Sequence, residues 1–266
     1  MNIVIKIGGQ AAEEEKDRRH LVRQIIALAR AGHRVVMVHG GGKALTQTLD
    51  RLGIPTTFHN GLRITDAATR DVALMVLAGS MNKQWVAELE VQGQAALGLC
   101  GGDGKLVMAR KLTASSNGSK KDLGFVGRPS KINKTILDVA FKQRFIPVVA
   151  SLGLSSSGEY LNINADDLAA ALAVALKADR LVYFAESGGV WDAGKQVLPL
   201  VRLKDIQRLI HQGVVRDGMI PKLRSCARTL QHGVREIDII SPSTPNALLR
   251  TVLKGESVGT RIVRTV

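Results

Sequence analysis

A lysine lies inside the first apolar stretch of the chain, directly before two glycines. Residues 3–7 read IVIKI, and Lys6 interrupts this run just ahead of Gly8 and Gly9. Glycine-rich turns recur at 40–42 and 101–102. Glycine lets backbone N–H groups approach a ligand closely, and a helix that begins at such a turn adds positive potential. These turns suit phosphate or carboxylate, although glycine also simply ends strands and the Lys6 head could reach solvent.

Two familiar nucleotide-binding patterns are missing from the sequence. In HGGGKAL at 39–45, Lys43 directly follows the glycines and no Ser or Thr comes next, so this is not the phosphate-binding loop with a GxxxxGK[ST] pattern. No GxGxxG opens a first helix. The glycine turns alone therefore leave the class of ligand open.

Composition narrows the class of protein. The net charge of +14 means that the surface attracts anions. We expect most of the excess positive charge to lie on the general solvated surface and part of it at a site for an anionic ligand. Aromatic residues make up only 3%, which argues against a platform for stacking nucleic-acid bases. No apolar run approaches the ~18–20 residues of a membrane span, and no charged-then-apolar leader is evident. We expect a cytoplasmic protein that binds neither nucleic acid nor membrane.

The two cysteines, Cys100 and Cys226, form neither a disulfide framework nor a metal-ligand spacing. We expect both thiols to be buried in a reducing compartment, and we expect no metal site built by the protein alone.

Strands and helices alternate along the chain in a way that can position the glycine turns. Strands are predicted at 2–7, 34–40, 145–151, 179–185 and 234–241, with another leading into the glycines of 96–104. Helices are predicted at 13–31, 43–53, 66–91 with a break near Gly79, and 164–178. A hairpin is predicted at 56–64 with Asn60-Gly61 as its turn, and a mobile polar loop at 113–122. Apolar strands separated by helices indicate an α/β fold, a three-layer αβα sandwich with a mainly parallel central sheet. Ligands of such sheets bind beyond the carboxyl ends of the strands.

Eight motifs occur in a fixed order over essentially the whole chain. They are KIGG (6–9), VHGGGKAL (38–45), NGLRITD (60–66), MVLAGSMNK (75–83), GLCGGDG (98–104), NINADDLAAALA (162–173), DGMIPKL (217–223) and GESVGTRIV (255–263). Together they resemble the amino acid kinase family, and within it the branch that phosphorylates N-acetyl-L-glutamate in arginine biosynthesis. Gln10 stands where aspartate kinases and glutamate 5-kinases carry a hydroxy residue.

The resemblance implies a phosphotransferase whose acceptor is a carboxylate. Such a group is ionised at neutral pH and needs no general base, so the task is to offset repulsion between the carboxylate and the γ-phosphate. By resemblance, Lys6 and Lys222 flank the transferred group, and Asp166 orients both ammonium groups. His39 beside the glycines is then structural.

The resemblance also implies the substrate contacts. Arg63 would clamp the α-carboxylate with its two-pronged guanidinium. Asn162 would bond the amino-acid portion, and Gly41 and Gly42 would offer N–H groups. Asn164 could bind as well, or could be only a turn or cap residue.

ATP binding is implied at a further set of residues: Gly8, Gly9, Glu186, Gly189, Val190, Val214 and Arg216. Relatives commonly read Thr-Asp-Val-Pro-Gly-Val where 185–190 read AESGGV, so Ala185 loses a hydroxyl and Gly188 loses a proline. Mg²⁺ would arrive with ATP and be held mainly by phosphates and water.

The family architecture implies two lobes. Residues 1–178 would form an N-lobe that binds the acylated amino acid and dimerises, and residues 179–266 a C-lobe that binds ATP. The apolar stretch 72–77 resembles the dimer contact. Because the first strand begins at Asn2 or Ile3, no residues are left for the N-terminal helix of arginine-inhibited relatives. We therefore expect a homodimer that arginine does not inhibit.

Two alternatives remain open from the sequence. One is a kinase for aminoadipate or glutamate attached to a small acidic carrier protein, which a basic surface would suit. The other is a non-catalytic anion sensor on the same fold.

Overall fold

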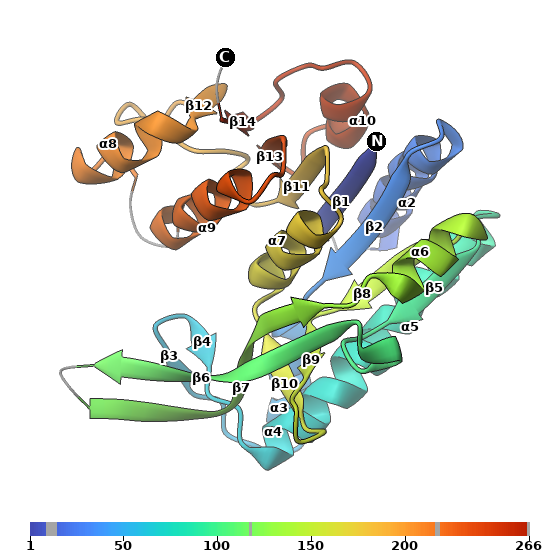
Figure 1. The fold of residues 1–266 in the computed structure, drawn as a ribbon, viewed down its shortest axis with the longest axis vertical. Coiled ribbons are helices and arrows are strands. Elements are labelled where there is room, and N and C mark those ends of the chain that lie inside the picture. The colour runs from blue at the N-terminus through green and yellow to red at the C-terminus, as the bar shows by residue number, and fades with distance from the viewer. Residues whose placement is uncertain (9–14, 117–118, 216–218, 265–266) are drawn as a thin grey trace. The chain divides into compact units, whose positions relative to one another are not determined.

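The computed structural model describes residues 1–8, 15–116, 119–215 and 219–264 (Figure 1). Contacts divide the chain into two compact units, residues 1–37 with 169–266, and residues 38–168. This division differs from the sequence-based boundary at residue 178. The N-terminal segment joins the C-terminal part because β1 (Asn2–Ile7) pairs in parallel with β11 (Arg180–Phe184).

The first unit is built on buried, mostly parallel strands. Besides β1 and β11 it contains β12 (Leu200–Arg202), β13 (Glu236–Ile240), β14 (Thr260–Val263) and most of β2 (Arg34–His39). The order is β12-β14-β13-β11-β1, and only the β13–β14 pair in this order is antiparallel. Continuous apolar runs such as that at 3–5, which is fully buried, are typical of strands covered on both faces. The α/β class with a mainly parallel sheet is confirmed.

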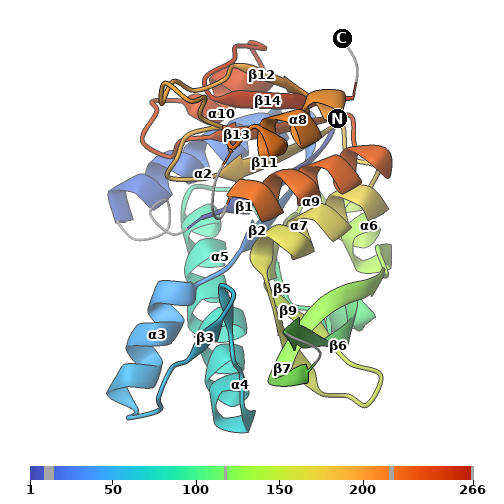
Figure 2. The same cartoon turned by 90° about the vertical axis from the view of Figure 1, so that its left-hand side faces the viewer.

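Helices lie on both sides of these strands (Figure 2). They are α2 (Glu15–Arg30), η3 (Leu203–Asp205), α8 (Ile206–His211), α9 (Met219–Gln231), α10 (Ala247–Val252) and most of α7 (Ala165–Ala175). Helices α2 and α10 share one side, where Gln24 Oε1 accepts the Leu248 N–H at 3.1 Å, and α7 and α9 lie on the other. α9 is therefore on a face of the strands where its first turn can reach their carboxyl ends.

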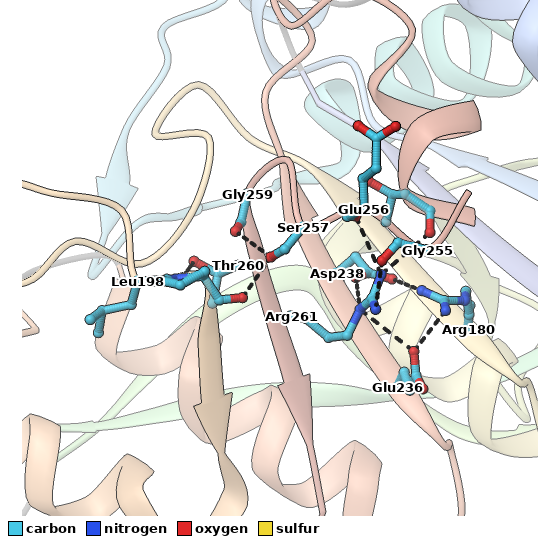
Figure 3. A network of polar contacts seen from close by, with 12 residues as sticks. Arg180, Leu198, Glu236, Asp238, Gly255, Glu256, Ser257, Gly259, Thr260 and Arg261 are labelled. Atoms are coloured by element: carbon cyan, nitrogen blue, oxygen red, sulfur yellow. Dashed lines mark hydrogen bonds and ion pairs between the residues drawn. The ribbon is translucent and has the colours of Figure 1, made fainter. Parts of the chain in front are cut away.

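A buried ion network ties the last strands together (Figure 3). The Asp238 carboxylate, whose side chain is 3% exposed, accepts Arg180 Nη1 at 2.8 Å and Arg261 Nε at 3.0 Å. Arg180 also pairs with Glu236 at 2.9 Å, and Arg261 Nη1 donates to the Gly255 carbonyl at 3.3 Å. Burial raises the pKa of Asp238 and the two guanidinium groups oppose this rise. The network fixes β11, β13 and β14 to one another and to the turn before β14.

The second unit combines a parallel strand pair with a small closed barrel. The pair is β5 (Ala96–Leu99) with β8 (Ile146–Ala150). The barrel contains β6 (Val107–Ser116), β7 (Ser119–Ile132), β9 (Leu152–Leu154) and β10 (Tyr160–Ile163). The prediction of a mobile loop at 113–122 is wrong, because β6 and β7 pair antiparallel through this region. Residues 117–118 are not among those that the structure describes. Its Ser, Lys and Gly composition hides strands whose stability comes from pairing with each other.

The predicted hairpin at 56–64 is confirmed. It consists of β3 (Phe58–His59) and β4 (Leu62–Arg63). Asn60 has φ 49° and Gly61 has φ 77°, the pair of positive φ values that a two-residue type I′ turn requires.

A continuous helical run replaces the predicted break near Gly79. The helices of this unit are α3 (Gly42–Arg51), α4 (Ala67–Ala73), the π-helix η1 (Leu74–Met81), α5 (Asn82–Val91), η2 (Asp103–Lys105) and α6 (Thr135–Lys142). Gly79 lies within the π-helical segment, a form that often marks functional regions.

The apolar stretch predicted as a dimer contact is mostly internal. Val72, Val76 and Leu77 are buried in the core of the second unit, whereas Met75 is 61% exposed. The large exposed apolar face expected from the sequence is thus reduced to Met75. None of the helices in the described ranges combines the length and the apolar character needed to cross a membrane.

Candidate functional site

A cavity of about 290 Å³ opens in the first unit at the ends of its strands. It is lined by Lys6, Gly8, Phe184, Ala185, Glu186, Ser187, Lys222 and Pro242. These residues come from the carboxyl ends of β1 and β11, the segment after β13 and the first turns of α9. This is where an open α/β sheet binds ligands.

Two lysines that are far apart in the sequence line this cavity, and each has Tyr183 as a neighbour. Lys6 on β1 is the register partner of Tyr183 on β11, so the two side chains point to the same face. Lys222 Nζ lies 4.9 Å from the centroid of the Tyr183 ring. Two ammonium groups in one cavity suit a ligand with several negative charges.

The glycine after the first strand is required by close packing. A Cβ at Gly8 would lie 2.6 Å from the Phe184 carbonyl oxygen and 3.6 Å from Lys6 Nζ. No larger residue fits between the lysine and β11. Gly9 lies outside the described residues.

The loop after β11 forms a tight turn at the cavity. The Gly188 N–H donates to the Ala185 carbonyl at 3.0 Å, and Gly188 has φ +64°. The φ angle of proline is fixed near −65°. A proline could not adopt the positive φ of Gly188, so the glycine permits a different backbone conformation here and not only a more flexible one. Glu186 is exposed beside the cavity.

Three of the predicted nucleotide residues that the structure describes, Gly189, Val190 and Val214, do not line the cavity. Gly189 and Val190 are buried behind the turn, where the Val190 N–H donates to Thr260 Oγ1 at 2.7 Å. Val214 follows α8, and its N–H donates to the Leu209 carbonyl at 3.2 Å. Arg216 lies outside the described residues. Sequence reasoning missed Ser187, although it sits within the predicted loop, and Pro242, whose only signal is its place just after a strand.

A second polar cluster lies in the other unit, around Arg63. Its side chain is 7% exposed and donates to the Gly42 carbonyl at 3.0 Å, to Thr46 Oγ1 at 2.7 Å and to Thr56 Oγ1 at 3.1 Å. The guanidinium carbon lies 4.8 Å from the centroid of the Phe58 ring. These contacts hold the hairpin against the first turn of α3. Burial lowers the pKa of Arg63 from a value so high that the group stays a cation.

The glycines before α3 differ in their steric role. A Cβ at Gly41 would clash with Met81 Sδ and lie 2.6 Å from Leu77 Cδ2, whereas a Cβ at Gly42 would meet nothing within 4 Å. Packing therefore requires glycine at 41, and leaves the space beside Gly42 open.

Asn162 joins the Arg63 cluster through a buried threonine. Asn162 Nδ2 donates to Thr65 Oγ1 at 3.3 Å, and the Thr65 hydroxyl donates to the Arg63 carbonyl at 2.9 Å. Thr65 was not singled out from the sequence. Asn164 caps α7, because its Oδ1 accepts the Asp166 N–H at 2.8 Å and the Asp167 N–H at 3.4 Å. The capped turn holds Asp166 near the positive end of the helix.

His39 is a buried, neutral histidine. Nδ1 contacts the Gly40 carbonyl at 2.9 Å and Nε2 contacts Asn82 Nδ2 at 3.1 Å. A carbonyl can only accept and an amide nitrogen can only donate, so Nδ1 carries the proton and Nε2 accepts. Burial lowers the pKa of His39 to about 4. This environment agrees with a structural role.

We expect the protein to lose stability through His39 as the pH falls. The folded-state pKa of about 4 lies below the ordinary histidine pKa of 6.5, so the unfolded chain binds the proton more readily between these values. The stabilisation is complete above pH 6.5 and is lost on the way to pH 4, by about 3 kcal/mol for this shift. Urea unfolding at several pH values measures it, with His39→Gln as a control that cannot titrate. Parallel pH curves for the two proteins would contradict the assignment.

Both cysteines are buried, as expected, and burial raises the pKa of the Cys100 thiol. Within the described ranges, no three His, Cys, Asp or Glu side chains come together as a metal site. A cation carried by phosphate groups would fit this arrangement, with Glu186 as a nearby carboxylate.

Comparison with known proteins gives consistent matches. Residues 1–241 match the model of the amino acid kinase family. The chain is 45% identical over 266 residues to the acetylglutamate kinase of Koribacter versatilis (strain Ellin345), with 100% of each chain covered. It is 40% identical to the acetylglutamate kinase of Methylobacterium nodulans (strain LMG 21967 / CNCM I-2342 / ORS 2060), covering 99% of this chain and 88% of the relative. The crystal structure of smu.665 from Streptococcus mutans UA159 is 33% identical, with a TM-score of 0.81 and 98% of each chain covered.

Proposed function

Because the chain belongs to the amino acid kinase family, we propose that it phosphorylates the side-chain carboxylate of N-acetyl-L-glutamate with ATP. The observation that carries this proposal is that Lys6 and Lys222 line one cavity at the carboxyl ends of β1 and β11. The acceptor is supported by full-length relatives that are named acetylglutamate kinase. The products would be ADP and an acyl phosphate, in a step of arginine biosynthesis.

The reaction needs charge compensation more than proton transfer. A carboxylate oxygen of the acceptor attacks the γ-phosphorus, the bond from that phosphorus to the β,γ-bridging oxygen breaks, and ADP leaves with the electron pair. No proton must be removed, which fits a structural and not a catalytic role for the neutral His39. Lys6 and Lys222 would neutralise the charge that spreads over the phosphoryl oxygens.

We assign ATP binding to the first unit. The cavity brings the two lysines together with the 185–188 turn, and Gly8 lets the backbone come close to the phosphates. Mg²⁺, when bound, would neutralise the β- and γ-phosphate oxygens. Glu186 is the carboxylate of this loop that could lie near it.

We assign the acylated amino acid to the second unit. The Arg63 guanidinium has five N–H groups, and its bonds to Gly42, Thr46 and Thr56 use three of them. Nε–H and one Nη1–H make no hydrogen bond to a residue that the structure describes; they lie on different edges of the guanidinium, so each could donate singly to a carboxylate. Asn162 is linked to the same cluster, and Gly42 is the first residue of α3, so its N–H has no acceptor within the helix and could serve a ligand. We keep Asp166, in the first turn of α7, as a catalytic residue that the family resemblance implies.

An assay that couples ADP release to NADH oxidation tests the proposal. Purified protein with Mg²⁺ and ATP should turn over free N-acetyl-L-glutamate, and should act far more slowly on L-glutamate and L-aspartate. Turnover only with glutamate or aminoadipate on an acidic carrier protein would favour that alternative kinase. ATP binding without turnover of any acceptor would favour a sensor.

We also propose that the protein forms a homodimer. The family resemblance supports it, and Met75 with 61% exposure and Val91 with 84% remain exposed along one helical run. Light scattering during size-exclusion chromatography should give twice the chain mass of 28.6 kDa. A mass of one chain at micromolar concentration would refute the dimer.

A further inference from the structure

The 185–188 turn at the cavity is held weakly by its own sequence. Its internal bond is the one from the Gly188 N–H to the Ala185 carbonyl, and Gly188 is in the left-handed region at φ +64°. Glycine loses more conformational freedom on ordering than any other residue. A turn of this kind needs contacts from outside to stay in one position.

The chain that follows the turn is, in contrast, firmly anchored to β14. Thr260 Oγ1 accepts the Val190 N–H at 2.7 Å and donates to the Leu198 carbonyl at 2.7 Å. The Leu198 N–H donates to the Val190 carbonyl at 2.8 Å. Figure 3 shows Thr260 and Leu198 beside the ion network. Residues 190–198 therefore form a fixed platform directly after the turn.

Trp191 connects this platform to the turn. It forms an isolated antiparallel bridge with Val197, and its indole Nε1–H donates to the Ser187 carbonyl at 2.8 Å. The Trp191 side chain is 47% exposed, so it contributes little to the core of the unit. Its directed contact is the bond to a residue that lines the cavity.

Ser187 is a residue whose position matters to a ligand. It lines the cavity, and its hydroxyl oxygen is buried and makes no hydrogen bond to any residue that the structure describes. A buried hydroxyl is costly when it has no partner. A nucleotide in the cavity could supply one only if the Ser187 side chain rotates toward the cavity and the turn stays in place.

We propose that Trp191 is a positioning residue for nucleotide binding: its indole N–H holds the Ser187 carbonyl and so keeps the 185–188 turn in its binding conformation. This inference rests on the proposed use of the cavity for ATP. Trp191 itself lines no part of the cavity and acts only through Ser187.

The test replaces the donor and keeps the ring. Trp191→Phe should weaken ADP binding, measured by calorimetry with Mg²⁺, by about three- to tenfold, as expected for one lost hydrogen bond. KM for ATP should rise by the same factor, while KM for N-acetyl-L-glutamate stays unchanged. The melting temperature should change little, because the side chain is half exposed. A lower melting temperature with unchanged ADP affinity would show a merely structural role and overturn the proposal.

Two further variants make the test specific. Val197→Thr changes the bridge partner of Trp191, leaves the indole donor intact, and should leave ADP affinity unchanged. Trp191→Phe should lose most of its effect in a Ser187→Ala background if the ordered turn serves to present the Ser187 hydroxyl. If Trp191→Phe weakens ADP binding equally in the wild type and in Ser187→Ala, the Ser187 hydroxyl is not the group through which Trp191 acts.

Fluorescence gives an independent readout. The chain has two tryptophans, and Trp85 is 1% exposed in the other unit. Titration with ADP should change the emission of the wild type, and Trp191→Phe should abolish the change. Failure of the proposed function is separable: ADP binding that depends on Trp191, without turnover of N-acetyl-L-glutamate, would refute the acceptor and support the inference. A wild type that does not bind ADP would refute both.

Discussion

Replacement of Lys222 by alanine is expected to lower kcat by about 10²- to 10³-fold, the usual loss when one group that stabilises transition-state charge is removed. Lys6→Ala should have an effect of the same size, because both lysines line the same cavity. The repulsion between acceptor carboxylate and γ-phosphate would otherwise be uncompensated. The change should appear in kcat at saturating substrates, measured by coupled ADP release.

A matched variant separates catalysis from charge in general. Lys204→Ala removes an exposed lysine of the same unit that does not line the cavity, and should leave kcat unchanged. Lys222→Arg keeps the charge but replaces a compact ammonium group by a planar fork, so partial activity is expected. Circular dichroism melting confirms that each variant is folded. Near-wild-type kcat for Lys222→Ala would rule out the two-lysine scheme.

Much of the first unit could be predicted from local sequence patterns. The strands at 2–7, 179–185 and 234–241 are continuous apolar runs, and burial on both faces leaves few other structures for them. The Asn60-Gly61 turn was equally predictable, because few residue pairs tolerate two positive φ values. Lys6 and Lys222 were found as motif members, and that they line one cavity depends on the packing of α9 against the strands.

Elements that depend on distant partners could not be read from the sequence. The β6–β7 hairpin is polar and rich in Ser and Lys, and becomes a strand pair only through mutual pairing. The π-helix reads like any apolar helix. Stretch 72–77 looked like an interface because its composition does not reveal that the second unit buries Val72, Val76 and Leu77 itself.

The nucleotide loop shows the same limit at the site. The sequence revealed that Ala185 and Gly188 depart from the family pattern, and left open what the departure does. The structure answers with a left-handed glycine and a tryptophan that bonds the turn from outside. Contacts between a side chain and a backbone carbonyl leave no periodic signal, so Trp191 could not be predicted.

Asp238→Ala is expected to destabilise the protein by about 3–5 kcal/mol, the range for removing one member of a buried ion pair. The change leaves the Arg180 and Arg261 guanidinium groups, 12% and 19% exposed, with the more exposed Glu236 as the one carboxylate of this network that still pairs with both. Arg235→Ala is the control, since its ion pair with Asp179 involves a side chain that is 79% exposed. It should change the free energy of unfolding by less than about 0.5 kcal/mol. Urea unfolding at pH 7 measures both.

The expected loss comes from two largely buried cations that lose their most buried carboxylate partner and keep only the more exposed Glu236, and not from the strength of the native pairs. The raised pKa of Asp238 indicates that the two arginines do not fully offset the cost of burying its carboxylate. Removing an arginine together with the aspartate should therefore cost less than the two single changes predict. In a double-mutant cycle, Asp238→Ala combined with Arg180→Met should recover about 0.5–3 kcal/mol relative to additivity. Strict additivity would show that the network is a set of independent contacts. The network could then not be what holds β11 and β13, and with them Phe184 and Pro242, in position at the cavity.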